Sequence, residues 1–347
     1  MRLFGEYEKQ RATVILFPYR KDVWRKDCKP IEKMIVELAN VIAEHQPVII
    51  GVLPGSEKYV AESYRLNKNV EIVPMKYNDC WARDTIGSVV MGEDSFVSAL
   101  NFNAYGGTLY KPWNDDEALD GTIAKYFGYK IKEFPIVMEW GNLLTDGNGT
   151  VFVVKDSILN PNRNPDLTLE RATEILKQAT ASKQVVWIER GLVGDETGGH
   201  VDNLLAFADR KRVLLSWTDD KDNPQYEIVR EVEALLKGVT NVHGEAYEII
   251  HLPVPGLTKR SFDESEGIVE DKDSLAREEG GCVLETYVNF AIANGVIVVP
   301  QFGHKKLDKE AIDILKAVFA DRRVVGLDGR EAALGGGGFH CLTKHVN

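Results

Sequence analysis

Apolar residues recur at helical spacing in several stretches of the chain. Between residues 30 and 44 they occupy positions 31, 34, 35, 38, 39 and 42, which predicts an amphipathic helix. The continuous apolar run at 47–53 follows and predicts a buried strand. The same helical spacing predicts four further helices, at 56–66, 169–182, 225–236 and 308–319.

Pairs of short apolar segments, separated by turn-forming residues, predict β-hairpins. These pairs lie at 88–100, 143–154, 203–216 and 287–299. A helix, a strand and a hairpin together return roughly every 50–80 residues, which is near the period of a propeller or solenoid. The pattern therefore predicts an α/β protein built from a repeated unit.

Polar residues of catalytic type lie just before three of the predicted hairpins, at the start of the fourth, or near the end of the chain. They are Asp84, Glu139, His200, Asp202, Asn289 and Cys341. If the hairpins surround an axis, these positions converge on one site. His200 and Asp202 are two residues apart at the expected start of a strand, so we expect them to face the same side.

The cysteine near the C-terminus follows four glycines, Gly335–Gly338. Such a run lets the backbone pass close to other groups, and a thiol is a strong nucleophile. Cys341 alone could equally be a buried inert thiol. A zinc site with His340 and His345 lacks a fourth ligand, and a phosphate-binding loop lacks the Lys-Ser/Thr that should follow it.

Carboxylates around a thiol suit a positively charged electrophile, because they oppose the oxyanion of ester or amide hydrolysis. Asp84 and Asp202 could hold the nitrogens of a planar guanidinium while Cys341 attacks its carbon. His200 would protonate the departing nitrogen and then activate water. This chemistry predicts hydrolysis of a guanidine to a ureido product and ammonia, without a metal or other cofactor.

Composition narrows the class of protein. The chain has 347 residues, 44% hydrophobic and 27% charged, with a net charge of −11. The charge argues against nucleic acid as a partner, and no apolar run is long enough for a membrane span. The N-terminal residues lack a signal-peptide pattern, and four scattered cysteines suggest reduced thiols. We expect one cytoplasmic domain over residues 1–347, and the sequence is compatible with a homo-oligomer.

Six motifs carry a resemblance to a known family. They lie at 78–84, 102–107, 159–165, 199–203, 287–290 and 335–343. On these motifs the chain resembles the agmatine deiminases of the guanidine-modifying (pentein) superfamily, almost from end to end. The resemblance implies a five-bladed α/β propeller, and a small guanidine, agmatine, as substrate. The implied product is N-carbamoylputrescine, a step toward putrescine in polyamine biosynthesis.

The resemblance also implies a role for each candidate residue. The family's nucleophile falls on Cys341 and its acid–base histidine on His200. The carboxylates that bind the guanidinium fall on Asp84 and Asp202. The family's additional active-site acid falls on Glu139, and an aromatic residue near the entrance falls on Trp81. Asn289 is a further expected substrate-site residue, although its amide could instead satisfy backbone groups.

Three positions depart from the family pattern: Trp140, Leu144 and Gly198. In addition, residues 141–147 resemble the matching stretch of bacterial peptidylarginine deiminases. A deiminase of arginine, peptidyl-arginine or another guanidine is therefore an alternative. A non-catalytic polyamine-binding protein on the same scaffold is a second one, and the loop acids Asp195 and Glu196 are either functional or merely solvated.

Overall fold

The helices predicted from apolar spacing are all present in the computed structural model, which describes residues 1–347. They are α1 (Lys29–Ala43), α2 (Glu57–Ser63), α8 (Leu169–Thr180), α9 (Tyr226–Gly238) and α11 (Lys305–Val318). The predicted buried strand is β3 (Val48–Val52), whose five residues are all buried. Periodicity located these elements because each buries one continuous apolar face.

The four predicted hairpins are also confirmed as antiparallel pairs. They are β5 (Ser88–Met91) with β6 (Phe96–Asn101), β8 (Leu144–Thr145) with β9 (Thr150–Val154), β11 (Leu205–Phe207) with β12 (Arg212–Trp217), and β16 (Ala291–Ala293) with β17 (Val296–Gln301).

Each hairpin is followed by a helix and a strand that pairs in parallel with the hairpin's second strand. The crossover helices are α6 (Leu119–Phe127), α8, α9 and α11. The returning strands are β7 (Lys130–Val137), β10 (Gln184–Ile188), β13 (Glu248–Pro253) and β18 (Arg323–Asp328). The repeated unit is thus a hairpin joined to a βαβ crossover.

The fifth hairpin is made from the two ends of the chain, and the sequence patterns did not predict it. β19 (Thr343–Val346) pairs antiparallel with β2 (Ala12–Leu16), with Thr343 opposite Ile15. From β2 the chain continues through α1 to β3 and then to β4 (Val70–Pro74), in parallel. This pairing anchors the segment that carries Cys341 in the interior.

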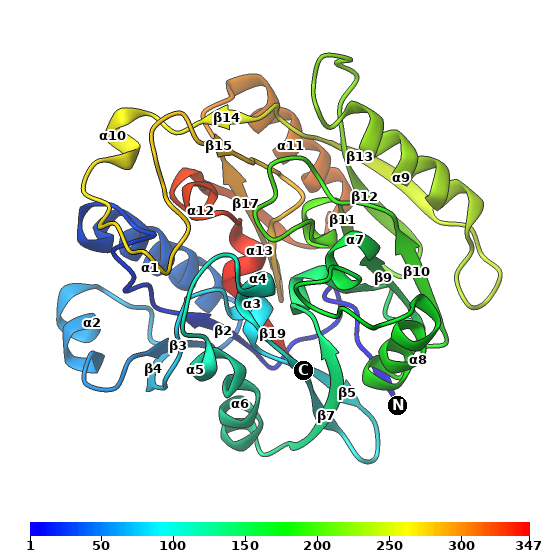
Figure 1. Ribbon diagram of the computed structural model, residues 1–347, viewed down its shortest axis with the longest axis horizontal. Helices are drawn as coiled ribbons and strands as arrows, with labels where there is room; N and C mark the ends of the chain where they lie inside the picture. The colour runs from blue at the N-terminus through cyan, green and yellow to red at the C-terminus, as the bar shows by residue number, and fades with distance from the viewer.

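Five small sheets therefore contain one such unit each, and the α/β class is confirmed. No strand pairing joins one of these sheets to the next. In Figure 1 the long helices α1, α6, α8, α9 and α11 lie at the periphery. The short helices α3 (Ala82–Thr85) and α13 (Phe339–Leu342) lie near the centre of the same view.

A long connection, residues 254–290, runs between the third and fourth units. It carries β14 (Thr258–Lys259), α10 (Phe262–Ser265) and β15 (Cys282–Val283). The remaining short elements are β1 (Arg2–Leu3), which pairs with β5, and α4 (Ala104–Gly107), α5 (Asn114–Glu117), α7 (Lys155–Ile158) and α12 (Arg330–Gly335). None of the helices is both long and apolar enough to cross a membrane.

Candidate active site

Short helical turns precede the hairpins, and they carry the candidate residues. Asp84 lies in α3, Glu139 precedes the turn η2 (Trp140–Asn142), and Asp202 lies in the turn η3 (Val201–Asn203). Cys341 lies in α13, immediately before β19. These turns are neighbours in space, since α3 contacts both α13 and η2, and η2 contacts η3. The predicted convergence of the hairpin starts is therefore present.

The sulfur of Cys341 is buried and lies between an amide and a carboxylate. Asn289 Nδ2 donates to Cys341 Sγ at 3.1 Å, and Asn289 Oδ1 accepts from the Cys341 backbone N–H at 3.2 Å. Asp202 Oδ2 is 3.5 Å from the same sulfur. Asn289 thus contacts the thiol directly and also fixes the backbone that carries it.

The glycine run before α13 is required by close packing. A Cβ on Gly335 would lie 1.9 Å from the Trp24 ring, and a Cβ on Gly338 would lie 2.4 Å from Asn289 Oδ1. Neither position has room for a side chain. The prediction that Gly335–Gly338 passes close to other groups is confirmed, and the group next to the last glycine is the amide bound to Cys341.

His200 is fully buried between two carboxylates. Its Nε2 lies 3.2 Å from Glu139 Oε2, and its Nδ1 lies 3.6 Å from Asp84 Oδ1. Burial opposes a charge on the ring, but Asp84 and Glu139 outweigh it and raise the pKa of His200 to about 9. The ring is therefore an imidazolium at neutral pH.

Glu139 lies behind His200, with both carboxylate oxygens occupied. Oε2 meets His200, while Oε1 accepts from Arg163 Nε at 3.0 Å. Burial works against its ionised form, but Arg163 and His200 overcome burial and lower the pKa of Glu139 to about 2. Arg163 also donates to the backbone oxygen of Thr197 at 2.6 Å, so it fastens this loop to the site.

The reason given for His200 and Asp202 facing one side was wrong. They do not lie in a strand, since β11 begins only at Leu205. His200 is instead the residue before η3, with extended backbone, and Asp202 is inside that helical turn. The turn still brings both side chains to the site, His200 beside Asp84 and Asp202 beside Cys341.

Asp84 is held from two sides. The Tyr105 hydroxyl donates to its Oδ2 at 2.7 Å, and the Gly141 backbone N–H donates to its Oδ1 at 3.1 Å. Burial and the nearby Asp202 raise the pKa of Asp84 to about 6, although His200 lowers it. A Cβ on Gly141 would lie 2.4 Å from Asp84 Oδ1 and 2.8 Å from His200 Nδ1, so only glycine fits there.

Three buried polar atoms of these loops find no hydrogen-bond partner in the protein. They are Asp202 Oδ1, His200 Nδ1 and Glu196 Oε2. Buried polar groups in proteins are nearly always paired, so unpaired ones mark where a polar ligand would bind. The set offers acceptors for a cation together with one ring nitrogen able to transfer a proton.

The cavity next to Cys341 is small, with a volume of about 10 Å³. Its lining includes Trp81, Asp84, Tyr105, Leu109, Glu196 and Cys341. The connection 254–290 lies against this lining, since Arg277 binds Glu196 at 2.6 Å and the Leu275 N–H donates to the oxygen of Leu109 at 3.0 Å. A cavity of this volume holds about one water molecule, so a substrate would need it to widen.

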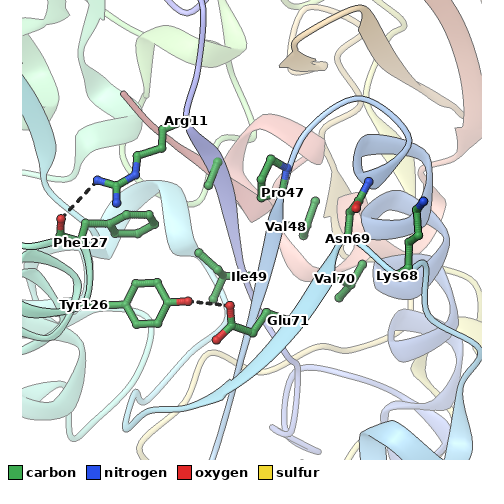
Figure 2. Close-up of a pocket in the computed structure, with 11 residues that line it drawn as sticks. Arg11, Pro47, Val48, Ile49, Lys68, Asn69, Val70, Glu71, Tyr126 and Phe127 are labelled. Atoms are coloured by element: carbon green, nitrogen blue, oxygen red, sulfur yellow. Dashed lines mark hydrogen bonds between the residues drawn. The ribbon is translucent and has the colours of Figure 1, made fainter.

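A larger pocket elsewhere contains none of the candidate residues. It encloses about 320 Å³ beside β3, β4 and the end of α6. Figure 2 shows Arg11, Tyr126 and Glu71 at its edge, with Tyr126 bonded to Glu71 at 2.8 Å. Its lining contains no cysteine, serine, threonine or histidine. The chemistry of the side chains, and not the size of the pocket, therefore identifies the site around Cys341.

The three departures from the family pattern lie outside the cavity lining. Trp140 is buried, with Lys344 Nζ 4.7 Å from its ring centre, and Leu144 is buried in β8. Gly198 has a φ of +85°, and a Cβ there would lie 3.4 Å from Arg163. Since none of them lines the cavity, their substitution does not alter its wall directly.

Sequence reasoning missed three residues that shape the site: Tyr105, His340 and Glu6. Tyr105 lies inside a family motif and binds Asp84. His340 precedes the nucleophile and binds Asp202, with Nδ1 and Oδ2 2.8 Å apart. His340 could have been found from the sequence, because it lies next to Cys341. Glu6 gave no signal, because nothing local indicates that the N-terminal segment reaches the site.

The fold and the site together indicate an α/β enzyme whose buried carboxylates suit a cationic substrate. Residues 2–346 match the Porphyromonas-type peptidyl-arginine deiminase family, and the chain belongs to that family. It is similar to "Putative agmatine deiminase 1" of Listeria monocytogenes, with 34% identity over 99% of this chain and 96% of the relative.

Two further similarities extend over nearly the full length. "Putative agmatine deiminase" of Vibrio parahaemolyticus is 35% identical, over 99% of this chain and 95% of the relative. The solved structure of the agmatine deiminase of Enterococcus faecalis superposes with a TM-score of 0.94 at 28% identity, over 99% of this chain and 95% of that one.

Proposed function

We propose that this protein hydrolyses agmatine to N-carbamoylputrescine and ammonia. One observation carries the proposal: a thiol, an imidazolium and two carboxylates lie together, with Asp202 Oδ2 3.5 Å from Cys341 Sγ and Asp84 Oδ1 3.6 Å from His200 Nδ1. Cys341 and Asp84 also line one small cavity. The similarity to proteins named agmatine deiminase supports the choice of substrate.

Asp84 and Asp202 would bind the guanidinium. A planar guanidinium pairs with carboxylates through two N–H groups at once, and the unpaired Asp202 Oδ1 supplies such an acceptor. Tyr105 and Gly141 orient Asp84 toward the same place. The expected result is a guanidinium carbon held beside Cys341 Sγ.

Binding of the cation would also activate the nucleophile. Burial, together with Asp202 and Asp84, raises the pKa of Cys341 well above its ordinary value, so the free enzyme holds a neutral thiol. A guanidinium between these carboxylates offsets their charge and favours the thiolate. The anionic sulfur is therefore formed mainly when substrate is present.

His200 would act first as acid and then as base. Glu139 holds Nε2, which leaves the proton on the unpaired Nδ1 for transfer. After the sulfur bonds to the guanidinium carbon, this proton passes to the leaving nitrogen and ammonia departs, giving a covalent thiouronium. Water, deprotonated by His200, then attacks that carbon, and the C–S bond breaks to release the ureido product.

The second cation of agmatine would bind at Glu196. Its Oε2 is buried without a partner in the protein, and the residue lines the same cavity as Cys341. Trp81 and Leu109 in the lining offer apolar surface for the methylene chain. On this basis Glu196 is a functional acid rather than a solvated loop residue.

The small size of the cavity disfavours peptidyl-arginine, the substrate that the family's name carries. Its volume is about 10 Å³, so a polypeptide would need a much larger opening than a small diamine. A free guanidine such as arginine remains the second candidate. The contact of an amide and a carboxylate with Cys341 favours catalysis over mere polyamine binding.

A side-by-side assay of guanidines tests the proposal. Purified protein is given agmatine, arginine and a short peptidyl-arginine, and both ammonia and the ureido product are measured. We expect the highest kcat/KM for agmatine by at least about tenfold, because Glu196 would repel the α-carboxylate of arginine, and the α-nitrogen of peptidyl-arginine is an uncharged amide. Faster turnover of another guanidine, or no turnover with reduced Cys341, contradicts it.

We further propose that the five units are the blades of a five-bladed propeller. Five of the candidate residues, Asp84, Glu139, His200, Asn289 and Cys341, each precede the hairpin of a different unit. The contacts between neighbouring turns support an arrangement around one axis.

All four cysteines are free, which supports a reducing, cytoplasmic location.

A further inference from the structure

A row of alternating charges runs from the N-terminal segment to Asp202. Arg83 Nη1 donates to Glu6 Oε1 at 2.9 Å, and the same oxygen lies 2.9 Å from His340 Nε2. The other ring nitrogen, His340 Nδ1, lies 2.8 Å from Asp202 Oδ2. The Arg83, His340 and Asp202 side chains are 4%, 6% and 1% exposed, so water screens this row poorly.

His340 must donate from both ring nitrogens, because both of its partners are carboxylates. Burial and Arg83 lower the pKa of His340, but Glu6 and Asp202 outweigh them and raise it above its ordinary value. Arg83 and His340 in turn hold the pKa of Glu6 well below its usual range, although burial opposes this. His340 is thus an imidazolium that is hydrogen-bonded to two carboxylates, those of Glu6 and Asp202.

The hydrogen bond from His340 leaves only one oxygen of Asp202 free. One oxygen of Asp202 is taken by His340 and touches Cys341, while Oδ1 stays free of protein partners. A charged hydrogen bond to the first oxygen fixes the direction of the second.

We propose that His340, held by Glu6, is a positioning residue that fixes Asp202 through a charged hydrogen bond and turns its free oxygen toward the substrate. The inference rests on the proposed function, since Asp202 would hold the guanidinium there. His340 itself does not line the cavity next to Cys341.

A second buried histidine provides a matched control. His345 Nδ1 lies 3.3 Å from Arg83 Nη1 and 3.8 Å from Glu6 Oε2, so it shares two neighbours with His340. Burial, with Arg83, lowers the pKa of His345 to about 3 despite Glu6, so its ring is neutral and accepts from Arg83. It makes no hydrogen bond to Asp202. A purely structural role of this cluster predicts similar effects at both histidines.

Two substitutions separate the charge of His340 from its hydrogen bond. In His340→Asn the amide nitrogen takes the place of Nδ1, so the bond to Asp202 is kept without the charge. We expect wild-type kcat/KM for agmatine above neutral pH. In the plot of kcat/KM against pH, the fall on the acid side (the acid limb) should move upward by about one pH unit. His340→Ala removes both, and we expect at least about a tenfold loss at every pH.

Glu6→Gln tests the same row from its far end, without touching Asp202 or Cys341. Without the Glu6 charge, burial and Arg83 lower the pKa of His340, and its ring loses a proton. The acid limb should therefore move as in His340→Asn. The double variant should behave like His340→Asn alone, because the two act in series. His345→Asn should leave the limb in place.

A second readout does not depend on agmatine turnover. Alkylation of Cys341 by 2-chloroacetamidine, a guanidinium mimic, is followed against pH in each variant. We expect the same upward shift for His340→Asn and Glu6→Gln, even if agmatine proves not to be the substrate. Unshifted profiles in both variants, or an equal shift in His345→Asn, would overturn the inference; thermal melting shows that each variant is folded.

Discussion

Glu196 is the residue on which the choice of agmatine depends most. One of its oxygens binds Arg277 at 2.6 Å, and the other is buried without a partner. Burial raises the pKa of Glu196 above its ordinary value even though Arg277 lowers it. A bound ammonium would satisfy the free oxygen and stabilise its charge.

We expect Glu196→Gln to lower kcat/KM for agmatine by about tenfold to a hundredfold, the cost of losing one charged hydrogen bond. Butylguanidine, which has the same guanidinium but no distal amine, is the control substrate. Its kcat/KM should change little. An equal loss for both substrates would show that Glu196 supports the loop and does not bind the amine.

Lys344 is a buried residue that the proposed chemistry does not use. It is 1% exposed, and its Nζ donates to Ser88 Oγ at 2.8 Å. Burial lowers the pKa of Lys344 well below its ordinary value, so between these two pKa values the folded state binds fewer protons than the unfolded state. Stability therefore rises with pH, from the lowered pKa up to the ordinary one.

We expect Lys344→Met to increase the free energy of unfolding at pH 7 by about 1 kcal/mol or more, because methionine fills similar space without a polar head. Urea unfolding at several pH values measures this. The difference between variant and wild type should shrink as pH rises. A less stable variant at pH 7 would show that Lys344 makes a net favourable interaction.

At the scale of elements, the segment that delivers Cys341 depends on the absence of a side chain. Gly338 has extended backbone that alanine can adopt, yet a Cβ there would displace Asn289, the amide bound to Cys341 Sγ. Gly121 in α6 has no atom within 4 Å of its ideal Cβ and serves as the matched control.

We expect Gly338→Ala to destabilise the protein by about 1–3 kcal/mol through overpacking. It should also reduce kcat, because Asn289 no longer positions the sulfur. Gly121→Ala should stabilise by about 0.5–1 kcal/mol and leave kcat unchanged. Thermal melting and initial rates on both variants measure these effects. Wild-type kcat in Gly338→Ala would contradict the assigned contact.

The same elements show what local pattern can predict. Helices such as α1 and α11 and all four internal hairpins follow from apolar spacing and turn residues, which act over a few positions. The pairing of β19 with β2 was missed, because its strands come from opposite ends of the chain. The contacts of residues 254–290 with the cavity lining were missed for the same reason, since their partners are distant in sequence.

At the scale of the whole molecule, the site exists because short turns from different units meet. The candidate residues could be predicted from their place before each hairpin and from the family motifs. The contacts between them could not be predicted. Glu139 binds His200, and Glu6 binds His340 although 334 positions of sequence separate them. Such contacts are set by the packing of units against one another, which no local pattern encodes.

The central claim is that Cys341 forms a covalent bond to the guanidinium carbon of agmatine. Acid-quenched protein, analysed by mass spectrometry during turnover, tests it most directly. The account predicts an adduct on Cys341 equal to agmatine less ammonia, absent from the folded Cys341→Ala variant, which should release no ammonia. Turnover by that variant, or an adduct on Cys28, Cys80 or Cys282 instead, would contradict it.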